Sequence, residues 1–219
     1  DRLSLRSAVQ RQLAKTLCEI RCAKHMSNFQ IDNDELVFSN YEFPPAPVYP
    51  TGRLARHQVS EIVILTGQAR VRYEPFQLLR IPFLDREQVF EWAHRTNIPC
   101  NEWIDVWGNL LEPFLDTEYT NERAAKIESE LSSVGMDATT VKALRSEVSS
   151  MMKAYNFDSM LWDWTYLDIF DLLSAARGTL SGPQYAMEEN QFFHFYFRVM
   201  NIALQGQKPS AQRTSHNTV

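Results

Sequence analysis

The sequence feature that most constrains the fold is the stretch IPCNEWIDVWGNLLEPFLD, residues 98–116. Its apolar residues recur at the spacing of one helical face, and Asn101 has the side chain of a helix N-cap. These apolar residues are Trp103, Val106, Trp107, Leu110, Leu111, Phe114 and Leu115. Their burial, at about 25 cal/mol per Å², stabilises the fold by several kcal/mol. The pattern predicts a helix at the seam between an N-terminal α+β part and a C-terminal helical part.

The residues before this seam predict one helix, several strands and a closing helix. Residues 3–26 have an apolar face flanked by basic side chains, which is typical of an amphipathic helix. Residues 29–43 predict a β-hairpin, because apolar residues alternate around the turn residues 32–34. Four prolines between residues 44 and 52 predict a stiff connection. Residues 53–83 predict further strands, and Asp85 is the expected cap of a helix over residues 86–96.

A resemblance to a known fold begins after the first predicted helix. It is carried by two segments that a loop joins and one helix follows, IDNDELVFSNYEF and GRLARHQVSEIVIL. Their order resembles that of pleckstrin-homology-like sheet-plus-helix modules in uncharacterised bacterial proteins. The resemblance covers residues 29–97 and implies a small antiparallel sheet with a closing helix. It concerns the fold and implies no function. An open α+β sheet is equally consistent with these residues.

The residues after the seam predict four more helices, over residues 121–134, 137–155, 159–177 and 184–204. Gly135, Gly178 and Gly206 follow three of them as expected helix stops. Together with the seam helix they predict a bundle of about five helices with short connections. The predicted fold is therefore α+β. It comprises a helix plus a small β-sheet module over residues 1–97, an acidic helical bundle over residues 98–206 and a polar tail over residues 207–219. The first two parts share a core through the helix over residues 101–116.

Composition and charge limit the function classes. The chain is 44% hydrophobic and 22% charged, as in globular proteins, and it has no apolar run of about 18 residues that predicts a membrane span. Three sparse cysteines favour a reducing compartment, so we expect a cytoplasmic protein. Residues 101–219 hold 9 basic and 16 acidic side chains, a net charge of −7, whereas residues 1–100 hold 13 and 11. This acidity disfavours nucleic-acid binding and suits a basic partner.

The sequence lacks three catalytic motifs. It has no glycine-rich phosphate-binding loop and no Gly-x-Ser-x-Gly, and it has only one Glu-x-x-His, where a di-iron bundle needs two. One alternative remains for an enzyme. Asp168 and Asp171 are spaced i,i+3, and Glu112 and Asp116 i,i+4, so that two helices could each present a carboxylate pair to Mg²⁺ or Mn²⁺. No other cofactor is expected.

The last predicted helix has more aromatic side chains than one face can bury. Either it is buried on several sides or it presents a patch to a partner. The candidate interaction residues are Phe192, Phe193, Tyr196, Phe197 and Met200. We therefore predict a protein-interaction or regulatory module without catalytic activity, whose partner is another protein or a second copy in a homodimer. A divalent-metal-dependent enzyme is the alternative.

Overall fold

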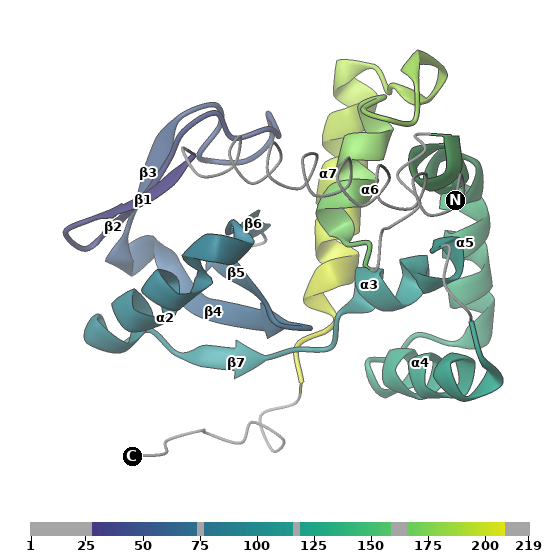
Figure 1. The fold of residues 1–219 in the computed structure, drawn as a ribbon, viewed down its shortest axis with the longest axis horizontal. Coiled ribbons are helices and arrows are strands. Elements are labelled where there is room, and N and C mark those ends of the chain that lie inside the picture. The colour runs from purple at the N-terminus through teal and green to yellow at the C-terminus, as the bar shows by residue number, and fades with distance from the viewer. Residues whose placement is uncertain (1–27, 74–76, 116–118, 159–165, 209–219) are drawn as a thin grey trace, which may run out of the picture.

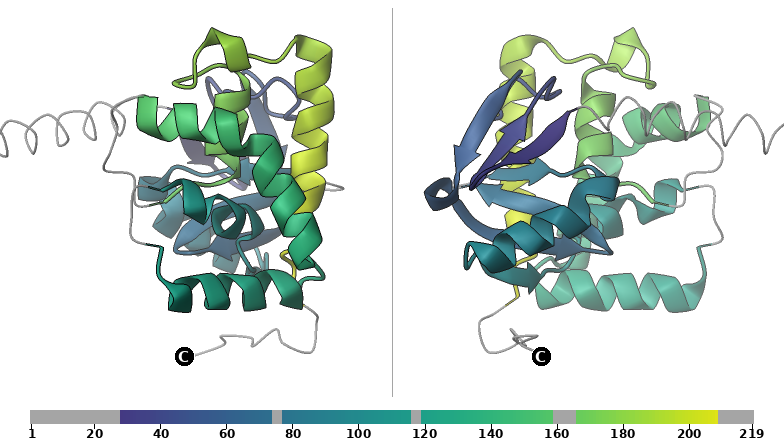
Figure 2. Two further views of the ribbon diagram at one scale, coloured as in Figure 1. Left: turned by 90° about the vertical axis from the view of Figure 1, so that its right-hand side faces the viewer. Right: turned by 60° about the vertical axis from the view of Figure 1, so that its left-hand side comes forward.

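The computed structural model describes residues 28–73, 77–115, 119–158 and 166–208. The described residues form an α+β fold in which two sheets and one helix lie beside a group of helices (Figure 1). Figure 2 shows from two further sides that these helices gather on one side of the sheets. The predicted helix over residues 3–26, most of the tail and Asp116 lie outside the described residues.

The first sheet is antiparallel, with the order β1 (Phe29–Asp32), β2 (Glu35–Phe38), β3 (Gly52–Ala55). The predicted hairpin is confirmed, with Phe29 opposite Phe38. Asn33 in its turn has a φ of 54°, a left-handed conformation that asparagine tolerates well. Leu36, Phe38 and Leu54 are buried, so this sheet has one face in the core.

The second sheet has the order β6-β5-β4-β7. Its strands are β4 (Val59–Leu65), β5 (Gln68–Tyr73), β6 (Gln77–Arg80) and β7 (Cys100–Glu102), and the short helix η1 (Arg56–Gln58) precedes β4. The chain then crosses over through η2 (Phe83–Asp85) and α2 (Arg86–Arg95), which lets β7 pair with β4 in parallel. The single antiparallel sheet that the resemblance implies is therefore not confirmed.

The seam differs from the prediction in its secondary structure. Asn101 is not a helix cap, because it lies in β7 and its side chain donates to Glu61 Oε2 at 2.6 Å. Asp105 is the cap instead, accepting from the Gly108 amide at 2.9 Å. The helix α3 (Val106–Leu111) continues into η3 (Glu112–Phe114), in which Pro113 cannot donate to an α-helical bond. Residues 100–102 form a strand because they pair with β4, whose backbone groups along that edge would otherwise lack hydrogen-bond partners.

The later helices end close to the predicted residues. They are α4 (Asn121–Ser133), α5 (Ala138–Lys153) with the π-helical turn η4 (Ala154–Asp158), α6 (Ile169–Ala176), η5 (Pro183–Tyr185) and α7 (Glu189–Leu204). Two of them begin later than predicted: α6 begins at Ile169, after the non-helical residues 166–168, and α7 begins at Glu189 instead of residue 184. Asp137 caps α5, and Gly135 before it has a φ of 87°. In Figure 1, α3 and α4 lie across the direction of α5, α6 and α7, so a regular bundle of about five helices is not confirmed. None of the described helices is long and apolar enough to cross a membrane.

One hydrophobic core runs through both parts of the molecule. It includes Leu36 and Ile62 from the sheets, Trp92 from α2, Trp107 from α3 and Met200 from α7. All seven apolar residues of the seam are buried, as predicted. The C-terminal end of α7 closes over this seam. The Trp107 indole donates to the Val199 carbonyl at 2.8 Å, and the Ile104 amide donates to the Gly206 carbonyl at 2.9 Å.

Candidate functional site

Buried ionic groups gather where the second sheet meets α6. Arg70 on β5 is 1% exposed and forms an ion pair with Asp168, which precedes α6. Arg80 lies opposite Arg70 in the β5–β6 register. The two guanidinium groups both face the Phe170 ring, at 5.0 and 5.7 Å from its centroid. The strands therefore place two neighbouring cations against the start of one helix.

The carboxylates on the other side of this contact cap α6. Asp168 Oδ1 accepts from the amides of Phe170 at 2.7 Å and Asp171 at 3.2 Å, and Asp171 Oδ2 accepts from the Asp168 amide at 2.9 Å. Burial opposes ionisation of Asp168, but the charges of Arg70 and Arg80 outweigh burial and lower its pKa. Burial and the charge of Asp168 raise the pKa of Asp171 to about 6. Tyr155 donates to Asp171 Oδ1 at 2.8 Å.

A third carboxylate, Asp105 in the seam, interacts with Arg70 and Asp168 through their charges. Tyr166 donates to Asp105 Oδ2, while Asp105 Oδ1 caps α3. Burial raises the pKa of Asp105. The network therefore joins β5, β6, α3 and α6, and it holds its charges away from solvent, since Asp168 and Asp171 are each 4% exposed. Within the part of the chain that the structure describes, these contacts orient α3 and α6 on the second sheet.

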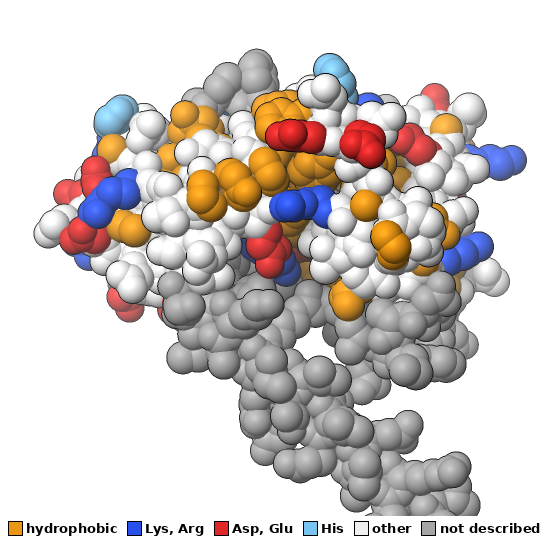
Figure 3. Space-filling view, turned by 90° about the horizontal axis from the view of Figure 1, so that it is seen from above, with side chains coloured by type: hydrophobic (Ala, Val, Ile, Leu, Met, Phe, Trp, Pro, Cys, Tyr) orange, Lys and Arg blue, Asp and Glu red, His pale blue; other side chains and the backbone are white. Residues whose placement is uncertain are grey.

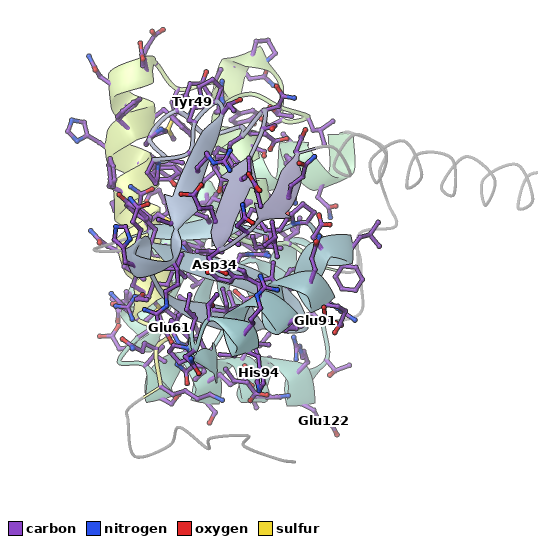
Figure 4. All side chains as sticks on the ribbon, turned by 90° about the vertical axis from the view of Figure 1, so that its left-hand side faces the viewer. Asp34, Tyr49, Glu61, Glu91, His94 and Glu122 are labelled. Carbon is purple, nitrogen blue, oxygen red and sulfur yellow. The ribbon has the colours of Figure 1, made fainter. Side chains whose placement is uncertain are left out.

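A separate buried carboxylate holds three strands together. Glu61 on β4, labelled in Figure 4, accepts from Arg72 on β5 at 2.7 Å and from Asn101 on β7 at 2.6 Å. The Arg72 guanidinium also lies 5.4 Å from the ring centroid of Trp103. Figure 4 further shows Asp34 between the first sheet and α2, where its carboxylate is 3.8 Å from Arg95. These contacts position the sheets and α2.

The carboxylates proposed for a metal are bound to different partners. Glu112 is held by Arg123, with Nε to Oε1 at 2.8 Å and a second nitrogen to Oε2 at 3.1 Å. Asp168 and Asp171 bind Arg70 and the backbone of α6, and Asp116 lies outside the described residues. Over the described ranges, no group of three or more His, Cys, Asp or Glu side chains could hold a metal ion. The structure therefore does not bring Glu112 together with the other two.

The aromatic residues of α7 are mostly internal. Phe192, Tyr196 and Met200 are buried, Phe193 is half-buried and Phe197 is 40% exposed. The Tyr196 ring packs against Phe192, and its hydroxyl donates to the Gln77 side chain on β6 at 3.1 Å. Of the two alternatives that the sequence left open, burial on several sides therefore describes three of the five candidate residues.

A small pocket lies between the first sheet and the end of β6. It encloses about 40 Å³, and its wall includes Phe29, Phe38, Tyr41, Glu42, Arg80 and Pro82. The Phe29 and Phe38 rings meet edge to face, with centroids 5.2 Å apart, and Phe38 meets Tyr41 at 5.7 Å. The Tyr41 hydroxyl accepts from the Arg80 amide at 3.0 Å, and the Arg80 guanidinium lies 4.0 Å from the Glu42 carboxylate. The pocket wall thus combines buried aromatic side chains with a charged pair and the polar residues Asn28, Ser39 and Asn40.

Two exposed apolar side chains follow Pro82 directly. Phe83 is 52% exposed and Leu84 58%, the highest values for large hydrophobic residues over the described ranges. The Arg86 guanidinium lies over the Phe83 ring at 4.2 Å and pairs with Glu87 at 3.0 Å. We call Phe83, Leu84 and the adjoining pocket the Phe83 surface. No local pattern in the sequence predicts it, because the pocket wall combines residues between 28 and 43 with Arg80 and Pro82.

A second face has apolar side chains on separate loops. Figure 3 shows a band of them at the end of the molecule where α7 begins, with acidic side chains along one edge. Tyr49 and Leu180 are 43% and 45% exposed. Arg177 crosses between the loops and donates to the Glu42 carbonyl. This contact fixes the β2–β3 loop against the end of α6.

Comparison with known proteins identified no relative. No protein-family model matches the sequence, and neither a curated protein nor a solved structure is significantly similar to it.

Proposed function

We propose that this protein is a protein-interaction module that binds its partner through the Phe83 surface. The observation that carries the proposal is the exposed pair Phe83–Leu84 beside an aromatic pocket. Binding energy in protein interfaces is concentrated in a few side chains, often large aromatic ones, that lie in well-packed pockets near the centre of the interface. Adjacent exposed apolar residues that follow a pocket-lining residue in the chain have this character.

The size of the pocket favours a protein partner over a small molecule. Its volume of about 40 Å³ is far below the roughly 300–1,000 Å³ of sites that enclose a whole ligand. It is suited to part of one side chain, which a partner would insert while Phe83 and Leu84 contact the surrounding surface. The charged pair of Arg80 and Glu42 supplies a polar rim of the kind that surrounds apolar anchors.

The pocket wall is held in place before any partner binds. Phe29 and Phe38 face each other across the β1–β2 hairpin, and Tyr41 is hydrogen-bonded to the backbone of Arg80. The Arg80 side chain in turn lies over Phe170, beside the buried network. A preformed wall lowers the ordering cost of binding, which leaves more of the contact energy as affinity.

A random peptide library displayed on phage tests this proposal. Peptides would be selected on the full chain, and their affinity measured for the wild type, for Phe83→Ser/Leu84→Ser and for Tyr119→Ser. Tyr119 is a matched control, because it is 38% exposed and precedes α4, far from the pocket. We expect selected peptides to share an apolar residue and to bind the double variant at least about tenfold more weakly, with no change for Tyr119→Ser.

Both variants replace exposed side chains, so their melting temperatures should stay close to that of the wild type. If the library yields no binder, or if its binders bind the double variant as well as the wild type, the proposed function is wrong.

A further inference from the structure

The loops of residues 39–51 and 177–189 form the apolar face at the start of α7, which we call the Leu180 face. Tyr49 and Leu180 are 43% and 45% exposed on it. Leu180 also has a φ of 63°, a left-handed conformation that is uncommon for leucine. We propose that residues 3–26 of this same chain dock on the Leu180 face. The inference concerns a different surface from the proposed function and does not rest on it.

Charge favours this segment as the occupant. Residues 1–27 hold six basic and two acidic side chains, a net charge of +4, which leaves −9 on the remaining residues. Figure 3 shows acidic side chains along one edge of the apolar band. The Leu180 face carries one base and three acids, namely Arg177, Glu42, Glu188 and Glu189. An apolar surface edged by acids is complementary to a helix whose apolar stripe is flanked by bases.

The described chain begins next to the Leu180 face. The Asn28 carbonyl accepts from the Ser39 amide at 2.9 Å. Three residues further on, the Glu42 carbonyl accepts from Arg177, which belongs to the same face. The eight residues that separate Ile20 from Asn28 span up to roughly 26 Å when extended. The segment therefore reaches the Leu180 face from its own point of attachment.

The segment also needs an apolar surface. A single helix of about 24 residues is only marginally stable in water, and packing of its apolar face supplies most of its stability in a protein. That face includes Val9, Leu13 and Ile20. The Phe83 surface suits it less, because the Arg86 guanidinium lies over the Phe83 ring at 4.2 Å and repels basic side chains.

Hydrogen exchange of the full chain, followed by mass spectrometry, tests the inference. We expect the amides of residues 9–20 to exchange at least about tenfold more slowly than in an unstructured chain. Leu180→Asn removes an apolar contact and keeps a residue that tolerates the left-handed conformation. Glu188→Lys/Glu189→Lys reverses the charge of the edge. Each of these two variants should lower the protection of residues 9–20 at least about threefold.

Glu122→Lys/Glu128→Lys is the matched control for the charge reversal. It changes the net charge by the same amount, on exposed residues of α4. Figure 4 shows Glu122 and Tyr49 at opposite ends of the molecule. Since the control lies far from the Leu180 face, it should leave the protection of residues 9–20 unchanged.

The segment supplies a reciprocal test. Leu13→Ser/Ile20→Ser removes two side chains from the predicted apolar stripe, whereas Ala14→Ser/Cys18→Ser changes the opposite side of the same predicted helix. The readout is exchange in residues 178–188, which does not depend on the helix propensity of the segment. We expect this exchange to become at least about twofold faster in the first variant and to stay unchanged in the second.

The outcomes decide the occupant. Protection of residues 9–20 that stays below about tenfold in the wild type overturns the inference, as does protection that either variant of the Leu180 face leaves unchanged. Protection that rises with protein concentration between about 5 and 100 µM identifies the segment of a second copy as the occupant and also overturns it. Protection that is independent of concentration, and that both face variants but not the control lower, supports the inference.

Discussion

The buried ionic network consists of Arg70, Arg80, Asp168 and Asp171, and replacing Arg70 is its most severe test. Arg70→Met keeps most of the side-chain volume but removes the cation that faces Asp168. Since Arg70 is 1% exposed and Asp168 4%, the remaining carboxylate has little access to water. Breaking a buried ion pair in this way costs about 3–5 kcal/mol, because a carboxylate that has lost its ion-pair partner stays in the core. We expect Arg70→Met to lower the free energy of unfolding by this amount.

Arg53→Met is the matched control. Arg53 also faces two carboxylates, Asp32 and Glu35, but its side chain is 51% exposed. Exposed pairs of this kind contribute about 0–1 kcal/mol. The assay is urea unfolding at pH 7, followed by circular dichroism. With a slope of roughly 2–3 kcal/mol per M, Arg70→Met should lower the midpoint by about 1–2 M and Arg53→Met by no more than about 0.5 M.

A second background separates charge from packing. Asp168→Asn keeps an oxygen that can cap α6 but carries no charge. In this background, Arg70→Met leaves no unpaired carboxylate at position 168, so its cost should fall by at least about 1.5 kcal/mol. Equal midpoint shifts for the Arg70 and Arg53 variants, or a cost of Arg70→Met that Asp168→Asn leaves unchanged, would refute the electrostatic reasoning.

Three further predictions concern pH, packing and metal ions. Because the pKa of Asp171 is raised from 3.8 to about 6, the stabilising contribution of its protonated form is present below about pH 4 and is lost as pH rises through 6. The hydrogen bond from Tyr155 favours the ionised form, so Tyr155→Phe should lower the free energy of unfolding by about 1 kcal/mol at pH 5 and by about 2–3 kcal/mol at pH 8. An equal loss at both pH values would contradict this reasoning. Gly206→Ala should destabilise by about 1–3 kcal/mol in urea unfolding, since its Cβ would lie 2.1 Å from the Ile104 carbonyl oxygen; a loss below about 0.5 kcal/mol would count against that contact. Mg²⁺ or Mn²⁺ at about 10 mM should shift the melting temperature by less than about 1 °C, because Glu112 is bound by Arg123, whereas a shift of several degrees that Glu112→Gln abolishes would revive the metal alternative.

Local signals in the sequence were sufficient for several elements. The alternation around Asn33 predicts the first hairpin, and Asp137 with Gly135 before it marks the start of α5. Helical spacing also identifies the buried side of the seam, since Trp103 and Trp107 are both in the core. These features depend on side chains and turns within a few residues of each other, which is the range that periodicity and capping describe.

Other features depend on residues that are distant in the sequence. Asn101 has the properties of a helix cap, yet its neighbours pair with β4 because that strand has a free edge. The Asp168–Asp171 spacing is compatible with a metal site, but Arg70, 98 residues earlier, is the partner that the fold provides. The pocket has the same origin, since Phe38 and Pro82 are far apart in the sequence and line it together only in the folded chain.

Calorimetric titration of a selected peptide into the full chain tests the central claim most directly, namely that Phe83 and Leu84 belong to a surface that binds a protein partner. The peptide would be titrated into the wild type, into Phe83→Ser/Leu84→Ser and into the exposed control Tyr119→Ser. We predict that the double variant binds at least about tenfold more weakly and that Tyr119→Ser binds as tightly as the wild type. Equal affinities of the wild type and the double variant would contradict the proposed surface.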